Sequence, residues 1–172
     1  MTSFLIKAHE NRAQSSWNGY KDCAFCRIIK DELPSFRVFE NDLVVAVLDI
    51  LPLRKGHTLV IPKAHFSRLS ELPPEYAAAV GLAVTKVAHA LTQALDNTAL
   101  NVVCNQEYAQ AVPHVHYHVI PAPTFGKQPL TPVAKDTEPL TMKEMHQREF
   151  DGRTELDEEE GEILAKQIRS KL

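Results

Sequence analysis

The sequence has little of what marks several classes of protein. Its three cysteines are an odd and small set, which argues against the disulfide framework of a small secreted domain. No segment approaches the ~18 apolar residues of a membrane span, and the apolar patch after Met1 is too short for a secretory signal. The formal net charge of -3 provides no general attraction to nucleic acid or anionic membranes. We therefore expect a cytoplasmic protein that binds neither nucleic acid nor membrane. A protein of this kind can also enter the nucleus.

Length and composition predict one α+β domain with an extension at each end. The 172 residues, 44% hydrophobic, are enough for one ordinary core. Residues 1–21 show no periodicity and form the expected N-terminal extension. Residues 22–122 form the expected domain, and residues 123–172 form a C-terminal extension with a proline-rich loop and a terminal helix.

Hydrophobic periodicity places the regular elements inside that domain. Short β-branched and apolar runs bounded by turn residues predict five strands, over 35–40, 43–50, 57–62, 99–105 and 114–120. Apolar residues in three- and four-residue steps predict a long helix over 74–96, and a shorter one is expected over 25–30. The long helix should lie across the sheet.

Three histidines alternate in the last of these strands. His114, His116 and His118 are separated by apolar or aromatic residues, and side chains at i, i+2 and i+4 share one face of a strand. A single histidine in a strand is usually a structural residue. Three in strict alternation are difficult to explain by packing, because neutral rings are rarely buried without partners. The segment therefore predicts a functional site.

This segment resembles the signature of the histidine triad superfamily of nucleotidyl hydrolases and transferases, His-φ-His-φ-His-φ-φ with φ hydrophobic. Residues 114–120 match every position, and further landmarks occur in order from the C-x-x-C pair to residue 122. The resemblance is closest to the nucleoside phosphoramidase branch. It implies a five-stranded antiparallel sheet with one long and one short helix, and a homodimer in which two sheets join into one of ten strands.

The resemblance also assigns the chemistry of the histidines. Neutral imidazole is a competent nucleophile, and the family places the attack at His116, which implies a nucleotidyl-histidine intermediate. The other ring nitrogen of His116 should donate its proton to a backbone carbonyl. We expect His118 to donate a hydrogen bond to a phosphate oxygen as charge develops. His114 completes the predicted catalytic set.

The loop before the histidines departs from the family pattern. Residues 105–113 keep Gln110 but have Ala111 where the family has a hydroxyl residue. The loop is also shorter than usual and contains no glycine, although glycine lets backbone N–H groups approach an anion closely. This departure affects leaving-group assistance, and it motivates the hypothesis of a nucleotide-binding adaptor with little catalysis.

Cys23 and Cys26 have the C-x-x-C spacing of a metal-binding turn. In some triad proteins such a pair binds zinc together with residues that correspond to His65 and His114 here. Four Cys₂His₂ ligands leave no position for water, so this zinc would be structural. Two alternatives stay open: ordinary thiols, or a zinc hydrolase that uses the three strand histidines as catalytic ligands.

A nucleoside pocket is expected next to the histidines. Asp49 ends an apolar strand and can accept hydrogen bonds from both ribose hydroxyls, and the resemblance favours that role. Asn105 is expected to reach the sugar or phosphate, and Gln110 is also expected to contact the nucleotide. Five apolar residues correspond to base-pocket positions but could equally be core: Phe25, Ile28, Leu33, Leu48 and Ile50.

The resemblance thus implies a hydrolase of nucleoside 5′-phosphoramidates, with a purine nucleotide of the AMP type as substrate. A dinucleoside polyphosphate hydrolase shares the nucleophile and differs in the leaving group. An adaptor protein with little catalysis is the alternative from another class. Structural zinc is the expected metal, and no organic cofactor is expected.

Overall fold

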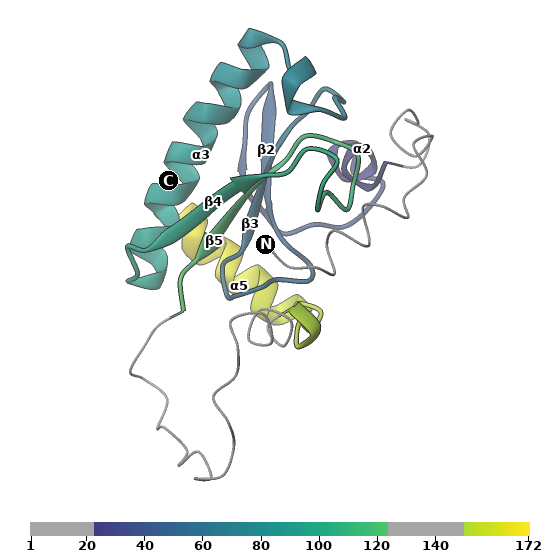
Figure 1. Cartoon of the computed structure of the whole chain (residues 1–172). Helices are drawn as coiled ribbons and strands as arrows, with labels where there is room; N and C mark the ends of the chain where they lie inside the picture. Colours follow the sequence, from purple (N-terminus) through teal and green to yellow (C-terminus); the bar gives the residue numbers. More distant parts are fainter. Residues whose placement is uncertain (1–22, 124–149) are drawn as a thin grey trace, which may run out of the picture.

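The computed structural model describes residues 23–123 and 150–172 and contains one five-stranded antiparallel sheet (Figure 1). The strand order is β1-β2-β3-β5-β4. The strands are β1 (Arg37–Glu40), β2 (Val44–Leu48), β3 (Thr58–Pro62), β4 (Leu100–Cys104) and β5 (Tyr117–Pro121). The predicted α+β class and antiparallel sheet are confirmed. The expected N-terminal extension and most of the proline-rich loop lie outside the described residues.

Strands β2 and β3 form the centre of the core, and every residue in both is buried. Their continuous apolar composition follows from coverage of both faces of the sheet. Alternation sends Val44, Ala46 and Leu48 to one face and Val45 and Val47 to the other.

Helices α3 (Pro74–Leu95) and α5 (Glu158–Arg169) cover the first of these faces (Figure 1). The stripe of α3 at three- and four-residue spacing is buried there, as predicted, through Val80, Ala83, Val87, Ala90, Leu91 and Ala94. A proline at its first position starts α3, where the missing N–H breaks no helical hydrogen bond. The prediction that the long helix lies across the sheet is confirmed.

The terminal helix α5, expected within the C-terminal extension, packs into this core. Leu164, Ala165 and Ile168 are buried among residues of the sheet and α3. At Gly161 a Cβ atom would lie 2.6 Å from the ring of Phe36, so only glycine allows this close approach. Asp157 caps the helix by accepting from two backbone N–H groups of its first turn. The last described segment is therefore part of the hydrophobic core.

Helix α3 corrects the expectation that no segment has the length and composition of a membrane span. It is 22 residues long and, by length and composition alone, apolar enough to cross a membrane. Core helices of soluble proteins share these properties, and Val87, Ala90 and Leu91 on the sheet-facing side of α3 are fully buried. Packing against the sheet accounts for this stripe of apolar residues.

Helix α2 (Ala24–Ile29) lies on the opposite face with a smaller apolar cluster. A 3₁₀ turn, η2 (Leu69–Glu71), precedes α3. The predicted strand over 114–120 is corrected, because β5 begins at Tyr117. Strand β3 ends at Pro62, and the chain before β5 continues instead with the Val115 N–H donating to the Phe66 carbonyl at 2.7 Å. His114 and His116 therefore lie in the approach to β5, and only His118 is in the ladder.

Candidate active site: the three histidines

His116 is held by a hydrogen bond from its own ring. Its Nδ1 lies 2.6 Å from the carbonyl oxygen of His114, and the side chain is only 2% exposed. A carbonyl only accepts, so Nδ1 carries the proton and the lone pair remains on Nε2. Burial lowers the pKa of His116, which keeps the ring neutral near pH 7. A neutral imidazole with one free lone pair has the form that nucleophilic attack requires.

A second pair of histidines lies beside it. The His116 and His118 rings are 4.8 Å apart, and His57 Nε2 lies 3.0 Å from His118 Nδ1. The Leu53 N–H points at His57 Nδ1 at 3.2 Å, which makes that atom an acceptor and assigns the proton to Nε2. His57 then donates to His118, so the remaining proton of a neutral His118 is on Nε2. In this tautomer His118 is a hydrogen-bond donor through Nε2.

Burial and neighbouring charge keep both of these rings neutral. Burial, followed by the proximity of His118, lowers the pKa of His57 to about 3. Burial, followed by the proximity of His116, lowers the pKa of His118 to about 4. The site can therefore donate and accept protons near pH 7 without carrying an imidazolium charge at rest.

His57 is not among the predicted site residues, and its place in this site was missed. The Asp49 N–H donates to the His57 carbonyl at 2.9 Å, directly beyond the last paired residues of β2 and β3. The Asp49 carboxylate also lies 3.3 Å from His57 Nδ1. Pairing the two predicted strands in register would have placed Asp49 opposite His57, so the hairpin pattern was the available signal.

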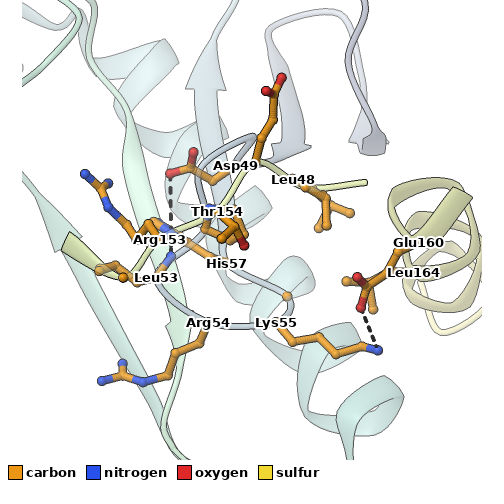
Figure 2. A pocket seen from close by; sticks show the side chains of 15 residues that line it. Leu48, Asp49, Leu53, Arg54, Lys55, His57, Arg153, Thr154, Glu160 and Leu164 are labelled. Atoms are coloured by element: carbon orange, nitrogen blue, oxygen red, sulfur yellow. Dashed lines mark hydrogen bonds and ion pairs between the residues drawn. The ribbon is translucent and has the colours of Figure 1, made fainter. Parts of the chain in front are cut away.

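Asp49 opens onto a cavity of about 260 Å³ between the β2–β3 loop and the C-terminal segment (Figure 2). Burial raises the pKa of Asp49, while the Leu51 N–H and the positive charge of Arg153 oppose that shift. The site thus contains a carboxylate with one fixed backbone donor, 2.9 Å from Oδ1. Asp49 directly follows β2, as the sequence predicts, and ribose binding by Asp49 stays a prediction.

Arg153 was not foreseen as a residue of this region. Its Nε donates to the Phe150 carbonyl at 3.0 Å, and its guanidinium lies 3.7 Å from the centre of the Phe150 ring. The Leu156 N–H donates to the Ile50 carbonyl at 2.8 Å, which ties this segment to the residue after Asp49. In Figure 2 Arg153 and His57 are on the same side of the cavity as Asp49. The segment is distant in sequence, so no local pattern could indicate this placement.

Four predicted metal ligands converge on the other side of the histidines. The ligand atoms of Cys23, Cys26, His65 and His114 all lie within 4.8 Å of one another. His114 Nδ1 is 3.4 Å from Cys23 Sγ, and His65 Nδ1 is 3.2 Å from Cys26 Sγ. His114 Nε2 donates to the Pro62 carbonyl at 2.8 Å, so its lone pair is on Nδ1 and faces the sulfurs. This arrangement fits a tetrahedral Cys₂His₂ metal centre.

The protonation chemistry of this cluster matches a metal site. Burial and the neighbouring Cys23 sulfur raise the pKa of Cys26 to about 11, so the pair is unfavourable as free thiolates. Burial lowers the pKa of His114 to about 4, leaving the neutral ring that a metal requires. A dication would stabilise both thiolates. The alternative with three catalytic zinc ligands is not supported, because the triad rings point to different partners: His114 to the sulfurs, His116 to a carbonyl and His118 to His57.

Only some of the predicted base-pocket residues lie on the histidine face. Phe25 is buried there, with its ring centre 5.0 Å from the centre of the His116 ring in an edge-on arrangement, and Ile28 packs beside it. Leu48 packs beneath the helices with Val44, because odd and even positions of β2 face opposite ways. At the end of β2 it also lines the cavity onto which Asp49 opens, so its place in a base pocket stays a prediction. Val47 faces the histidine side.

The remaining predicted nucleotide contacts vary in position. Ile50 is 55% exposed after the end of β2. Leu33 lines a surface groove with Pro34 and Arg37. Asn105 follows the last residue of β4. None of these positions is buried in the core, so a ligand can still reach them.

The loop without glycine uses other residues in left-handed conformations. Glu107 and Ala109 both have φ of 58°, which costs roughly 1–2 kcal/mol for each residue that has a Cβ atom. Gln110, expected to contact nucleotide, is 1% exposed and bonded to backbone instead. Its Oε1 accepts from the Glu107 N–H, and its Nε2 donates to the carbonyls of Ser67 and His114. Gln110 therefore shapes the loop.

Comparison with known proteins agrees with this fold. A family model described as HIT domain matches residues 30–124, and the chain belongs to the HIT family. A Schizosaccharomyces pombe protein, adenosine 5′-monophosphoramidase hnt1, is 42% identical over 103 residues, which are 59% of this chain and 74% of that protein. The Arabidopsis thaliana protein adenylylsulfatase HINT3 is 38% identical over 102 residues. That match covers 58% of this chain and 52% of the relative, so the chain spans about half the relative's length.

A solved structure of a zinc-bound relative is similar to this chain in fold. The zinc-bound histidine triad family protein from Mycobacterium smegmatis matches with a TM-score of 0.66 at 28% identity. The match covers 89% of this chain and 94% of that structure. The similarity therefore extends over most of the chain.

Proposed function

We propose that this protein is a nucleotide hydrolase that cleaves nucleoside 5′-phosphoramidates of the AMP type through a covalent nucleotidyl-His116 intermediate. The observation that carries the proposal is the hydrogen bond from His116 Nδ1 to the His114 carbonyl, which leaves Nε2 as the nucleophilic atom. Family membership and relatives named monophosphoramidase and adenylylsulfatase support nucleotide hydrolysis in general. The P–N bond is the finer part of the proposal.

Two displacements at phosphorus complete the reaction. His116 Nε2 attacks the α-phosphorus, a new N–P bond forms, and the bond to the leaving amine breaks as the amine takes a proton. His118 Nε2–H is the available hydrogen-bond donor for a phosphate oxygen, and His57 fixes the His118 ring. The leaving amine takes its proton from solvent, and the water that attacks in the second step returns one, so His118 stays neutral. Water then attacks the nucleotidyl-histidine, releases the nucleoside monophosphate and restores the neutral ring. Asp49 would hold the ribose hydroxyls throughout.

We also propose that Cys23, Cys26, His65 and His114 bind a structural zinc ion. The convergence of their ligand atoms and the zinc-bound relative support this assignment. Four protein ligands leave no open position, so the zinc would supply no water for catalysis. Its place is structural: it would join α2 to His114, whose carbonyl accepts the proton of His116.

The homodimer remains part of the proposal. Strand β4 pairs only with β5 among the described residues, and Val102 on it is 44% exposed. An edge strand with an exposed apolar side chain is suited to pairing with a second copy. Sedimentation that gives the mass of a single chain would refute this part of the proposal.

The test compares leaving groups and looks for the intermediate. Adenosine 5′-phosphoramidate, adenylyl sulfate and a dinucleoside polyphosphate are each mixed with the native protein, and AMP release and intact protein mass are followed. We expect fastest turnover of the phosphoramidate and a transient adenylyl adduct. His116→Ala should remove the adduct and lower turnover at least about 10³-fold. His89→Ala, on the exposed side of α3, is the matched control and should retain activity.

Tight nucleotide binding without turnover or adduct would contradict the proposal and favour the adaptor hypothesis. Faster turnover of the polyphosphate would keep the nucleophile and change the leaving group.

A further inference from the structure

We propose that Arg68 is a positioning residue: its ion pair with Glu107 holds residues 106–112 of the glycine-free loop in the conformation that orients His116. This inference rests on the proposed function and assigns a role that neither the histidines nor the metal ligands fulfil. Arg68 Nε lies 2.5 Å from Glu107 Oε1. The two residues are 39 positions apart, so the pair joins the turn before η2 to the loop.

The ion pair acts on Glu107, whose backbone conformation is unfavourable for a residue with a side chain. Glu107 has a left-handed φ of 58°, a conformation that glycine adopts freely and that glutamate rarely adopts. An external contact is needed to keep such a residue there. The Arg68 guanidinium supplies it, with Arg68 and Glu107 side chains only 30% and 36% exposed. A second contact from the same turn, the Ser70 N–H to Gln106 Oε1 at 3.0 Å, holds the preceding residue.

A chain of hydrogen bonds leads from this position to the nucleophile. The Glu107 N–H donates to Gln110 Oε1 at 2.7 Å, which fixes the direction of the Gln110 amide. Gln110 Nε2 then donates to the His114 carbonyl at 3.3 Å. That same carbonyl accepts the His116 Nδ1 proton at 2.6 Å. A rotation of Glu107 out of the left-handed region would turn its N–H away from Gln110 and release one of the two donors on this carbonyl.

The chain offers a matched control for the charge of Arg68. Its Nη1 also lies 3.1 Å from Glu71, a carboxylate on η2 that does not touch the loop. Arg68 therefore has one partner in the loop and one outside it. Removing the outer carboxylate tests the effect of changing an Arg68 ion pair without changing the loop.

The experiment is a double-variant cycle with kcat and KM measured separately on adenosine 5′-phosphoramidate. We expect Arg68→Ala and Glu107→Ala each to lower kcat about tenfold with little change in KM, since small misplacement of a nucleophile slows the chemical step. In a Glu107→Gly background, Arg68→Ala should lower kcat less than about twofold, because glycine needs no partner to stay left-handed. Glu71→Gln should retain kcat, and all variants should show similar unfolding transitions.

Two outcomes would overturn the inference. One is an Arg68→Ala variant with unchanged kcat. The other is the same tenfold loss in the Glu107→Gly background, with a rise in KM, which would make Arg68 a direct substrate contact. A native protein without turnover would refute the proposed function alone. Amide hydrogen exchange over 106–112 then still decides the inference: Arg68→Ala must speed exchange there, and the Glu107→Gly background must remove that effect.

Discussion

The buried histidines predict a specific loss of stability in mild acid, and His118 gives the clearest test. Burial lowers the pKa of His118 from 6.5 to about 4, so the folded protein resists protonation of this ring. As the pH falls from 7 to 5, the unfolded chain takes up this proton and the folded chain does not. Stability that is fully present above pH 6.5 is therefore lost progressively down to about pH 4.

The size of the effect follows from the same shift. A pH of 5 is about 1.5 units below the pKa of this histidine in the unfolded chain. Protonation of the unfolded chain alone therefore lowers the unfolding free energy by roughly 2 kcal/mol. We expect His118→Gln to be less stable than the native protein at pH 7. Between pH 7 and pH 5 the variant should lose about 2 kcal/mol less than the native protein loses. Any zinc released by acid contributes equally to both proteins and cancels in this difference.

Urea unfolding followed by far-UV circular dichroism at the two pH values, at constant ionic strength, measures this difference. His89→Gln, a substitution on the exposed side of α3, should lose as much stability as the native protein. Equal losses in the native protein and in His118→Gln would refute the reasoning, because His118 would then titrate alike in the folded and unfolded states.

Three further predictions concern the core, the metal centre and the ribose site. Leu164→Ala in α5 should lower the unfolding free energy by about 2–5 kcal/mol in a single urea transition. The control Ile163→Ala, at a residue that is 61% exposed, should change it by less than about 0.5 kcal/mol. A separate early transition would show that α5 is not part of the core. The Cys23→Ser variant should contain no bound zinc by elemental analysis and should have a lower melting temperature. The Cys104→Ser variant should retain zinc, and equal zinc content in the two variants would contradict the metal assignment. Asp49→Asn should raise KM for a ribonucleotide about tenfold, because an amide accepts fewer hydrogen bonds than a carboxylate. It should leave KM for the matching 2′,3′-dideoxynucleotide unchanged, and equal effects on both substrates would argue against ribose recognition.

The sheet and the histidine site were predictable because their signals are local. Five short β-branched runs and one long amphipathic stretch define the α+β class without reference to distant contacts. The alternation of His114, His116 and His118 also lies within one segment. The metal ligands came from spacing and family resemblance together, and the structure brings all four within 4.8 Å.

Errors arose where strand faces and ends had to be known. The predicted strand over 114–120 was too long, because β5 begins at Tyr117, and the helix-facing side of Leu48 could be assigned only from alternation along β2. His57 was missed because nothing in the neighbouring sequence distinguishes it from a structural histidine. Its role depends on the hairpin register, which places it opposite Asp49 and beside His118. Gln110 was expected at the nucleotide, but in the fold its amide is bonded to backbone.

By itself, the sequence determined the strands, the long helix and the residue types of the site, since hydrophobic period and motif spacing are properties of neighbouring residues. Only the tertiary structure decided which distant segments complete that site. It brought Arg153 to the side of Asp49, packed α5 against the sheet and joined Arg68 to Glu107. These contacts connect residues whose sequence separation carries no periodic signal. Their formation depends on how the whole chain packs, and no local pattern encodes that packing.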